Sequence, residues 1–381
     1  MSTSDTKSAD LRRRVYPLDA RKLSEEQIAV AFAMTSRRPE PFDQIAQQVS
    51  QEKAADFHER WVLGYGHASV AEHAVVHLAV ENVSRLACDS LEDNRLASYT
   101  EKSSRYQVLP EGSYYFPAEL DVQPALGEAY RQVCDQLFRS YQQLIDGCKT
   151  YLRQVYPQLE KERDSAYSMR LGRIATDHCR AILPAATLTN VGVTANARML
   201  EHAISKLLSS ELAEERDLGF EIRDQGREIT PTLIKYAEEN ASLRKTAHRQ
   251  LELSAEMLSP KEHLLNSGGD GAICARLLDW DTQAEEKLAT ALLYQNASVT
   301  YLTVRQQVAD MDSAQRQGII DSCTESMGPH DAPGREFELV NYTIEFLMDY
   351  GAYREFKRHR MQSYIPQMLT VAHGHSTPRV I

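Results

Sequence analysis

Two matching stretches of the sequence carry the side chains best suited to bind an anion. The later stretch, Lys357–Tyr364, reads KRHRMQSY and places Arg358, His359 and Arg360 in a row, within a chain whose net charge is -11. The earlier stretch, Asp93–Tyr99, reads DNRLASY, with an acid and an amide in place of Arg and His. Clustered guanidinium groups are typical of phosphate sites. The later stretch therefore predicts a local pocket for an anionic ligand.

A second candidate group follows the earlier stretch, in RLASYTEKSSRY. Glu101, Ser103 and Arg105 alternate, so an extended backbone would place all three side chains on one face. One acceptor, one hydroxyl and one guanidinium fork suit a nucleotide's phosphate and base edge. The alternative interpretation is a solvated strand edge or turn.

The basic stretch also has a plain structural interpretation. Arg354, Lys357, Arg358 and Arg360 fit a solvated helix face, whose charges pair with nearby Glu355 and with the acidic first half of the chain. Surface runs of this kind are common, so the basic stretch alone does not decide between the two interpretations.

The elements that position these residues occur twice. Arg95, Ser98 and Tyr99 recur 265 residues later as Arg360, Ser363 and Tyr364, and His67 matches His330 at an offset of 263. A period this long predicts a tandem duplication of whole domains, with an incomplete second copy. We expect the first repeat at residues 1–255, a linker at 256–277 that includes the Gly-rich stretch Leu264–Cys274, and a truncated second repeat at 278–381.

Hydrophobic periodicity predicts an α/β (α+β) class, with long helices packed on a mainly antiparallel sheet. VAEHAVVHLAVENVSRLA, from Val70, and REFELVNYTIEFLMD, from Arg335, are predicted as strands. Asp164–Pro184 is predicted as a helix that Pro184 ends. The stretch from Asn196 to Gly226 has leucine and isoleucine at i, i+4 spacing, which predicts one long amphipathic helix.

Composition excludes several function classes. Hydrophobic residues at 42% and charged residues at 25% are typical of globular proteins. The acidic balance argues against a broad nucleic-acid surface. No apolar run is long enough for a membrane span, so we expect a cytoplasmic protein without membrane contact. Six scattered cysteines without a C-x-x-C pair predict no metal site.

Four motifs in order resemble the flavin-dependent thymidylate synthases. That family has an R-H-R, seven residues, then S motif, preceded by G-H-x-S-x-x-E-H and followed by A-R-x-x-L-P and N-A-R. The first repeat has GHASVAEH, DNRLASYTEKSSRY, CRAILP and TANARM, and Arg95 and Ser103 keep the spacing. The resemblance covers most of the first repeat and the front half of the second.

Each repeat departs from the family pattern at a different place. In the first, Asp93 and Asn94 replace the family's Arg and His, so negative charge lies where the family binds flavin. In the second, R-H-R is complete, but the following Asn, Glu and Ser are absent. A later family arginine is replaced by Leu207.

The resemblance implies one composite active site between the repeats. The implied nucleotide and catalytic residues are Ser103, Arg105 and Arg180, and the implied cofactor-binding residues are Arg358, His359, Arg360, His73, Glu101 and Asn196. It further implies FAD, with NADPH and methylenetetrahydrofolate as co-substrates, and a homo-oligomer, a dimer of tandem repeats. The implied reaction is one-carbon transfer to C5 of a dUMP-like pyrimidine nucleotide.

Two alternatives stay open beside that function. One is a flavoprotein of the same ancestry that acts on a different substrate. The other is a non-catalytic subunit that binds flavin or nucleotide in an assembly.

Overall fold

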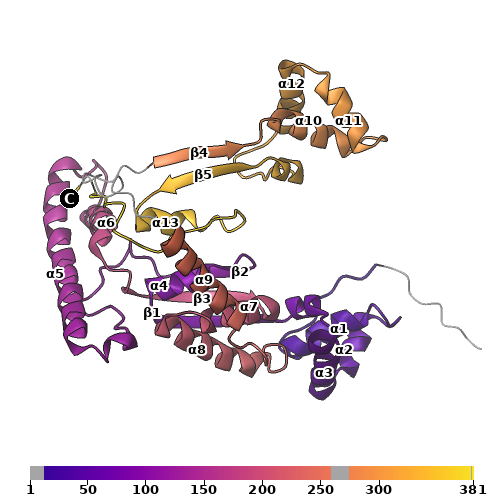
Figure 1. Cartoon of the computed structure of the whole chain (residues 1–381), viewed down its shortest axis with the longest axis horizontal. Coiled ribbons are helices and arrows are strands. Elements are labelled where there is room, and N and C mark those ends of the chain that lie inside the picture. Colours follow the sequence, from indigo (N-terminus) through magenta and orange to yellow (C-terminus); the bar gives the residue numbers. More distant parts are fainter. Residues whose placement is uncertain (1–12, 259–273, 379) are drawn as a thin grey trace, which may run out of the picture. The chain divides into compact units, whose positions relative to one another are not determined.

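The chain forms two compact units in the computed structural model, which describes residues 13–258, 274–378 and 380–381. The first unit contains residues 1–261, 354–367 and 377–381, and the second contains residues 262–353 and 368–376. Figure 1 labels their helices and strands. The first unit therefore includes a segment, residues 354–367, that the sequence analysis assigned to the second repeat.

A three-stranded antiparallel sheet forms the centre of the first unit. Its order is β1-β3-β2, with β1 at Val75–Ser84, β3 at Leu188–Asn196 and β2 at Ala97–Glu101. Alternate residues of β3, including Val191, Val193 and Ala195, are buried in the largest hydrophobic core. This antiparallel sheet confirms the predicted class, while the predicted strand from Val70 begins only at Val75, after the 3-10 helix η2 at Ala68–His73.

Helices α4, α7 and α8 contribute to the same core. They span Arg85–Glu92, Ala197–Leu208 and Ala213–Ile229. The single long helix predicted from Asn196 was wrong, because residues 209–212 separate α7 from α8. Ser209 donates its hydroxyl to the carbonyl of Ser205 at 2.6 Å and accepts the amide of Asn240 at 2.8 Å, so its side chain satisfies backbone groups at the end of α7.

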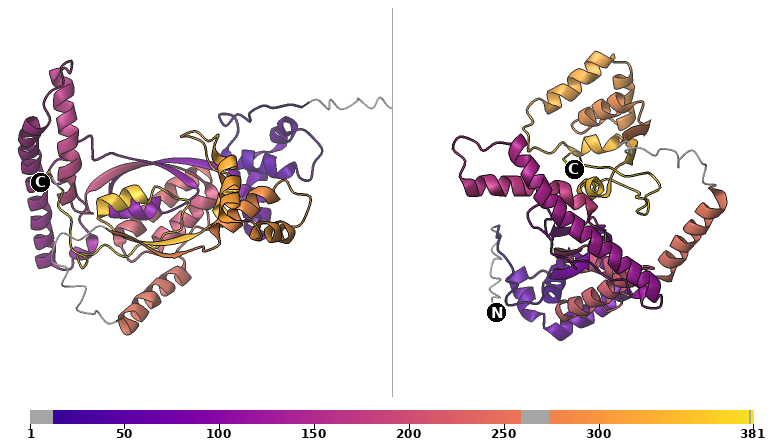
Figure 2. Two further views of the ribbon diagram at one scale, coloured as in Figure 1. Left: turned by 90° about the horizontal axis from the view of Figure 1, so that it is seen from above. Right: turned by 90° about the vertical axis from the view of Figure 1, so that its left-hand side faces the viewer.

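A second hydrophobic core of the first unit lies between two long helices. Long helices α5 (Pro124–Val155) and α6 (Asp164–Cys179) lie side by side (Figure 2). Phe138, Tyr141 and Leu171 belong to the hydrophobic core between them. The predicted helix end at Pro184 is confirmed within a few residues, because α6 passes into the 3-10 helix η4 at Arg180–Ile182. The other helices of residues 13–258 are α1 (Glu25–Met34), α2 (Phe42–Gln48), α3 (Gln51–Phe57), the π-helix η1 (His58–Gly64), η3 (Ala118–Leu120) and α9 (Ala241–Met257).

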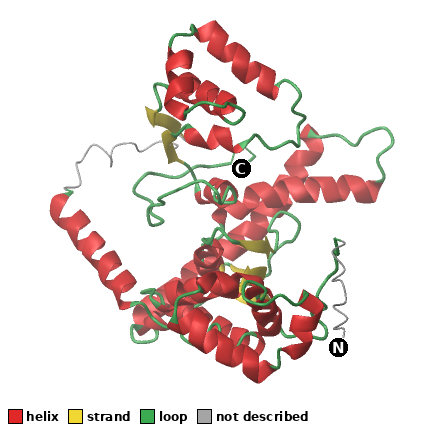
Figure 3. Ribbon diagram, turned by 90° about the vertical axis from the view of Figure 1, so that its right-hand side faces the viewer, coloured by secondary structure: helices red, strands yellow, loops and turns green. Residues whose placement is uncertain are grey.

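The second unit combines a two-stranded antiparallel sheet with short helices. Strand β4 (Cys274–Trp280) pairs with β5 (Tyr342–Leu347), and Ala289, Val304 and Val308 form a small core. Its helices are α10 (Ala284–Tyr294), α11 (Tyr301–Ala309), α12 (Ser313–Thr324) and the 3-10 helix η6 (Arg335–Leu339). Figure 3 shows this predominance of helix. Residues 264–273 of the Gly-rich stretch, which was predicted as a linker, lie outside the described residues. Its last residue, Cys274, is the first residue of β4.

Part of the order of elements recurs in the second half of the chain. Leaving out η1, the run α1, α2, α3, η2, β1, α4 corresponds to α10, α11, α12, η6, β5, α13, with α13 at Tyr350–Phe356, whereas β4 has no counterpart among the described residues before α1. Helix α4 begins at Arg85 and α13 at Tyr350, which is the 265-residue offset of the sequence motifs. This order supports the predicted duplication, which stays a prediction.

The packing of α8 makes a testable prediction. Gly226 is buried, and a Cβ atom there would lie 2.5 Å from Cδ1 of Ile234 and 3.3 Å from Cδ2 of Leu200. We expect Gly226→Ala to lower the free energy of unfolding by about 1–3 kcal/mol, because overpacking outweighs the better helix propensity of alanine. The matched control is Gly147→Ala in α5, where nothing lies within 4 Å, which should stabilise by about 0.5–1 kcal/mol. Urea denaturation measures both, and equal effects would contradict the packing argument.

Candidate functional site

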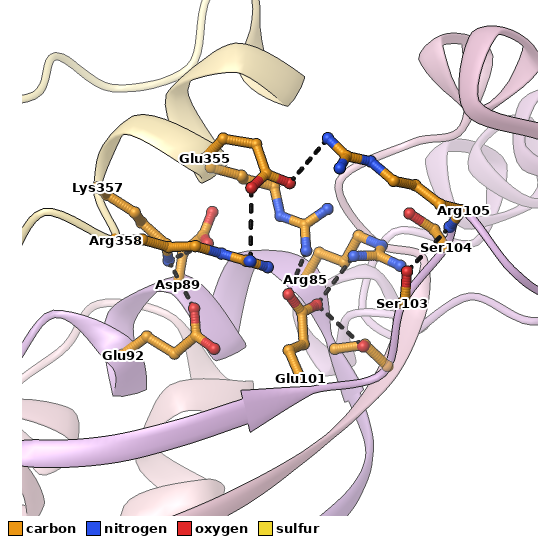
Figure 4. Close-up of polar contacts among 12 residues, drawn as sticks. Arg85, Asp89, Glu92, Glu101, Ser103, Ser104, Arg105, Glu355, Lys357 and Arg358 are labelled. Atoms are coloured by element: carbon orange, nitrogen blue, oxygen red, sulfur yellow. Dashed lines mark hydrogen bonds and ion pairs between the residues drawn. The ribbon is translucent and has the colours of Figure 1, made fainter. Parts of the chain in front are cut away.

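A buried carboxylate, Glu101, lies at the end of β2 between two arginines. Its Oε1 accepts hydrogen bonds from Nη1 of Arg85 at 2.8 Å and Oγ1 of Thr189 at 2.9 Å, and its Oε2 pairs with Nη2 of Arg354 (Figure 4). Only 6% of the Glu101 side chain is exposed. This group carries two positive charges against one negative charge.

A second buried group has one positive charge and two negative charges. Nζ of Lys357 pairs with Asp89 and lies 3.2 Å from Oε2 of Glu92, and the lysine side chain is 4% exposed. Burial alone would lower the pKa of Lys357, but the two carboxylates outweigh it and hold that pKa above its ordinary value. Burial also raises the pKa of Glu92. The two groups join residues 354–357 to α4 and β2.

A more exposed group, the arginine rim, consists of Arg105, Arg180, Asp177, Ser104 and Glu355. One oxygen of Asp177 lies 3.1 Å from Nε of Arg105 and 2.8 Å from Nη2 of Arg180, whose Nη1 donates to Ser104 at 3.0 Å. Nη2 of Arg105 also lies 3.3 Å from Oε1 of Glu355 (Figure 4). Burial lowers the pKa of Arg180. Two guanidinium groups thus converge on one carboxylate, the arrangement that a phosphate also requires.

Glu101, Ser103 and Arg105 do not share one extended face. Strand β2 ends at Glu101, which points into the buried group, and residues 104–106 form a turn. The Ser103 hydroxyl accepts the backbone N–H of Arg105 at 3.2 Å, a local serine bond typical of turns. The expectation of one shared face was wrong because the strand ends before the alternation is complete.

The predicted R-H-R residues differ in their surroundings. Arg358 is 64% exposed and lies 3.4 Å from Oε2 of Glu355, and the exposed His359 contacts the Phe356 ring. Arg360 lies over the Tyr99 ring, 5.6 Å from its centroid. Its buried Nη1 has no hydrogen-bond partner among the described residues.

A small cavity adjoins Arg360. Its volume is about 70 Å³, and Nε2 of Gln362 is a second buried donor beside it without a partner in the described part of the chain. It is lined by Asp93, Asn94, Arg95, Arg360, Gln362 and Tyr364. Asp93, which the sequence analysis treated as an obstacle to a phosphate, is engaged by Nζ of Lys206 and the Tyr364 hydroxyl at 2.7 and 2.9 Å.

The other two predicted cofactor residues, His73 and Asn196, lie at the ends of η2 and β3. His73 ends η2 and is exposed, with its ring 5.0 Å from that of Phe32. Asn196 ends β3 and caps α7, because its Oδ1 accepts the N–H of Met199 at 2.9 Å. Within the described part of the chain, no hydrogen bond, ion pair or ring contact joins these two residues to the R-H-R residues.

The sequence analysis missed three residues that organise the site. Arg85 and Thr189 reach Glu101 through sheet pairing, which no local pattern reveals. Asp177 had a local signal, since it precedes Arg180 by one helical turn in DHCR. Leu207, where the family has an arginine, is buried in the core at 1% exposure.

Two classes of site have no support within the described ranges. These residues contain no group of three or more His, Cys, Asp or Glu side chains that could hold a metal ion. They also contain no helix of the length and apolarity that a bilayer span needs.

The buried Glu101 group makes a stability prediction. Glu101→Gln removes the buried carboxylate that Arg85 and Arg354 share, and we expect the free energy of unfolding to fall by about 3–5 kcal/mol. Glu252→Gln on α9 is the control, since its partner Arg249 is 55% exposed, and it should cost less than about 1 kcal/mol. Guanidinium denaturation compares them, and similar losses would show that the buried charge is not needed.

Comparisons with known proteins agree with these motifs. Residues 18–232 match the family model described as thymidylate synthase complementing protein. A UPF0159 protein of Chlamydia pneumoniae is 33% identical over 343 residues, which cover 86% of this chain and 63% of that protein. A flavin-dependent thymidylate synthase of Clostridium tetani is 27% identical, over 56% of this chain and 82% of its own length. The chain therefore spans less than two thirds of the Chlamydia relative.

Two solved structures are similar to part of this chain, both with low scores. One is a flavin-dependent thymidylate synthase from Helicobacter pylori, complexed with FAD and dUMP. It is 14% identical with a TM-score of 0.38, and the match covers 57% of this chain and 96% of that chain. The other is a UMP/dUMP methylase from Streptomyces cacaoi bound with 5-Br dUMP, with 17% identity, a TM-score of 0.41 and coverages of 55% and 88%. Because the family model matches more than half of the chain, the protein belongs to the thymidylate synthase complementing protein family, which is ThyX-like.

Proposed function

We propose that this protein is a flavin-dependent enzyme that transfers a one-carbon unit to C5 of a pyrimidine nucleotide such as dUMP. Membership of the family supports the reaction class. The observation that carries the proposal is that residues 354–360 lie beside the loop that contains Ser103 and Arg105, through the Arg354–Glu101 and Arg105–Glu355 pairs. One composite site would thus combine the loop of the first repeat with the R-H-R residues of the second.

In this proposal the arginine rim binds the nucleotide. A phosphate would take the place of Asp177 or Glu355 between Arg105 and Arg180, since a dianion with three oxygens offers these guanidinium groups more hydrogen bonds than one carboxylate. The arginines would then also stabilise negative charge that develops on the pyrimidine ring. Ser103 would orient the nucleotide. Its hydroxyl accepts a backbone N–H and has no neighbouring base, so it is no nucleophile.

The described residues fit the anionic part of a flavin cofactor. Two buried donors without a partner, on Arg360 and Gln362, border a cavity of about 70 Å³. That volume is several times the roughly 10–15 Å³ that one water molecule needs, so it suits a small anionic group and is too small for the flavin ring. Arg358 and His359, both exposed, would hold the rest of FAD, together with His73, Asn196 and the loop at Glu101.

Bound flavin would supply the hydride and carry the one-carbon unit, with NADPH and methylenetetrahydrofolate as co-substrates. The chain's own residues would position the nucleotide and exclude water around C5. Assembly as a homo-oligomer, a dimer of tandem repeats, belongs to the same proposal.

A second candidate function has its own supporting observation. Both oxygens of Glu101 are in buried contacts, and Arg105 is paired with two carboxylates. Side chains engaged within the chain favour a non-catalytic subunit that binds flavin or nucleotide in an assembly. A third candidate keeps the flavin but acts on a different substrate.

The visible absorption spectrum of the purified chain, with and without dUMP, tests the proposal. We expect a flavin band after FAD is added and excess is removed, and a shift of that band when dUMP binds nearby. A chain that never retains flavin would contradict the enzymatic proposal and favour the non-catalytic one.

Single substitutions test whether the second repeat binds the flavin and the first repeat binds the nucleotide. Arg360→Ala should abolish flavin retention because it removes a buried donor without a partner. Arg95→Ala should change flavin retention little, although Arg95 lines the same cavity, because its guanidinium is exposed and already donates to Ser363. Arg105→Ala should weaken dUMP binding, measured by calorimetry, by about tenfold or more, the loss that a charge-assisted hydrogen bond predicts, and should leave flavin unchanged. Equal loss of flavin in both Arg95→Ala and Arg360→Ala would contradict a composite site.

A further inference from the structure

The contact between residues 354–364 and α4 joins segments that occupy matching places in the two repeats. At the offset of 265, Asp89, Glu92 and Asp93 correspond to Arg354, Lys357 and Arg358. All three acids of the first repeat are thus basic residues in the second. We call residues 89, 92 and 93 the acidic α4 surface, and residues 354–364 the basic segment.

Residues at the same repeat position contact each other directly. Glu92 and Lys357 correspond at the offset of 265, and their charged atoms lie 3.2 Å apart in a buried group. Arg95 and Arg360, another corresponding pair, line one cavity. When corresponding positions of two similar bodies meet, the contact is of the two-fold type, in which each side presents the same patch.

Neighbouring contacts also join the stretch at residues 93–99 to the stretch at residues 360–364. Arg95 donates to Ser363 at 3.0 Å, and Arg360 lies over the Tyr99 ring. The Tyr364 hydroxyl donates to Asp93 at 2.9 Å. Residues 93–99 therefore contact residues 360–364, which are largely their own counterparts one offset away.

Charge inversion decides which segments can form this contact. Two identical first-repeat patches would bring Glu92 against Glu92, with Asp89 close by, in a place where Lys357 is only 4% exposed. Like charges without counter-charges in such a buried place are strongly unfavourable. Two second-repeat patches would bring lysine against lysine. Only the unlike pairing neutralises the buried charges.

We propose that the acidic α4 surface is an interaction surface that accepts the basic segment of a second repeat and rejects another first repeat. The partner is the basic segment of the same chain, which occupies the surface in this structure. The selectivity comes from repulsion in the like pairings as much as from attraction in the unlike one. This proposal goes beyond the proposed function, since it needs neither flavin nor nucleotide.

Peptide binding to a chain with an uncovered surface tests the selectivity. Lys357→Glu adds an acid to Asp89 and Glu92 and should release the chain's own segment. We expect a labelled peptide of residues 354–367 to bind this variant at least about tenfold more tightly, by fluorescence anisotropy, than the matching peptide of residues 89–102. A scrambled 354–367 peptide controls for general attraction to an acidic chain, and a 354–367 peptide with Lys357→Glu tests the central contact.

The expected order of binding has the native 354–367 peptide first and the other three far behind. Equal binding of the 89–102 peptide, or of the scrambled peptide, would overturn the proposal. Failure of all four peptides to bind a folded variant, as judged by circular dichroism, would overturn it as well.

A charge exchange in the intact chain keeps the proposal testable if the single variant does not fold. Glu92→Lys and Lys357→Glu should each lower the melting temperature, because each creates a like-charge contact. The double variant should recover most of the loss, because it restores one base opposite one acid at the same pair of positions. Arg249→Glu on exposed α9 is the control and should change little. No recovery in the double variant would overturn the proposal.

Discussion

Two groups of largely buried, opposite charges hold the candidate site together. Around Glu101, two arginines exceed the carboxylate by one positive charge, and around Lys357, two carboxylates exceed the lysine by one negative charge. Because an uncompensated buried charge costs several kcal/mol, Arg354 and Lys357 must stay where their counter-charges are. The position of the R-H-R residues beside the Ser103 loop follows from this constraint.

Local sequence patterns predicted the elements better than their contacts. The antiparallel sheet and the helix from Asp164 followed from periodicity and from Pro184, whereas the break at Ser209 did not, because leucine spacing continues to Leu212 although Leu212 is 41% exposed. The partners of Glu101 could not be predicted, because Arg85, Thr189 and Arg354 are brought to it by sheet pairing and by the return of a distant segment. Local hydrophobic periodicity does not predict such long-range charge pairs.

The two interpretations of the basic stretch each describe part of it. Arg358 is exposed and paired with Glu355, as the interpretation of a solvated helix face expects. Lys357 is instead buried against the acids of the first half, and a nitrogen of Arg360 is buried beside a cavity. One short run of basic residues therefore contains a surface charge, a structural anchor and a candidate ligand contact. Sequence alone could not separate them, because burial rather than residue type distinguishes the three.

The arginine rim and the buried groups differ in how they respond to dissolved ions. The rim side chains of Arg105, Asp177 and Glu355 are each 40–44% exposed, so mobile ions can reach them. At physiological ionic strength the Debye length is about 8 Å, and contacts between exposed charges are screened much more than buried ones. Rising ionic strength should therefore loosen the carboxylates from Arg105 while the anchor of residues 354–357 stays closed. The surrounding electrolyte can thus tune the availability of this arginine without unfolding the scaffold that presents it.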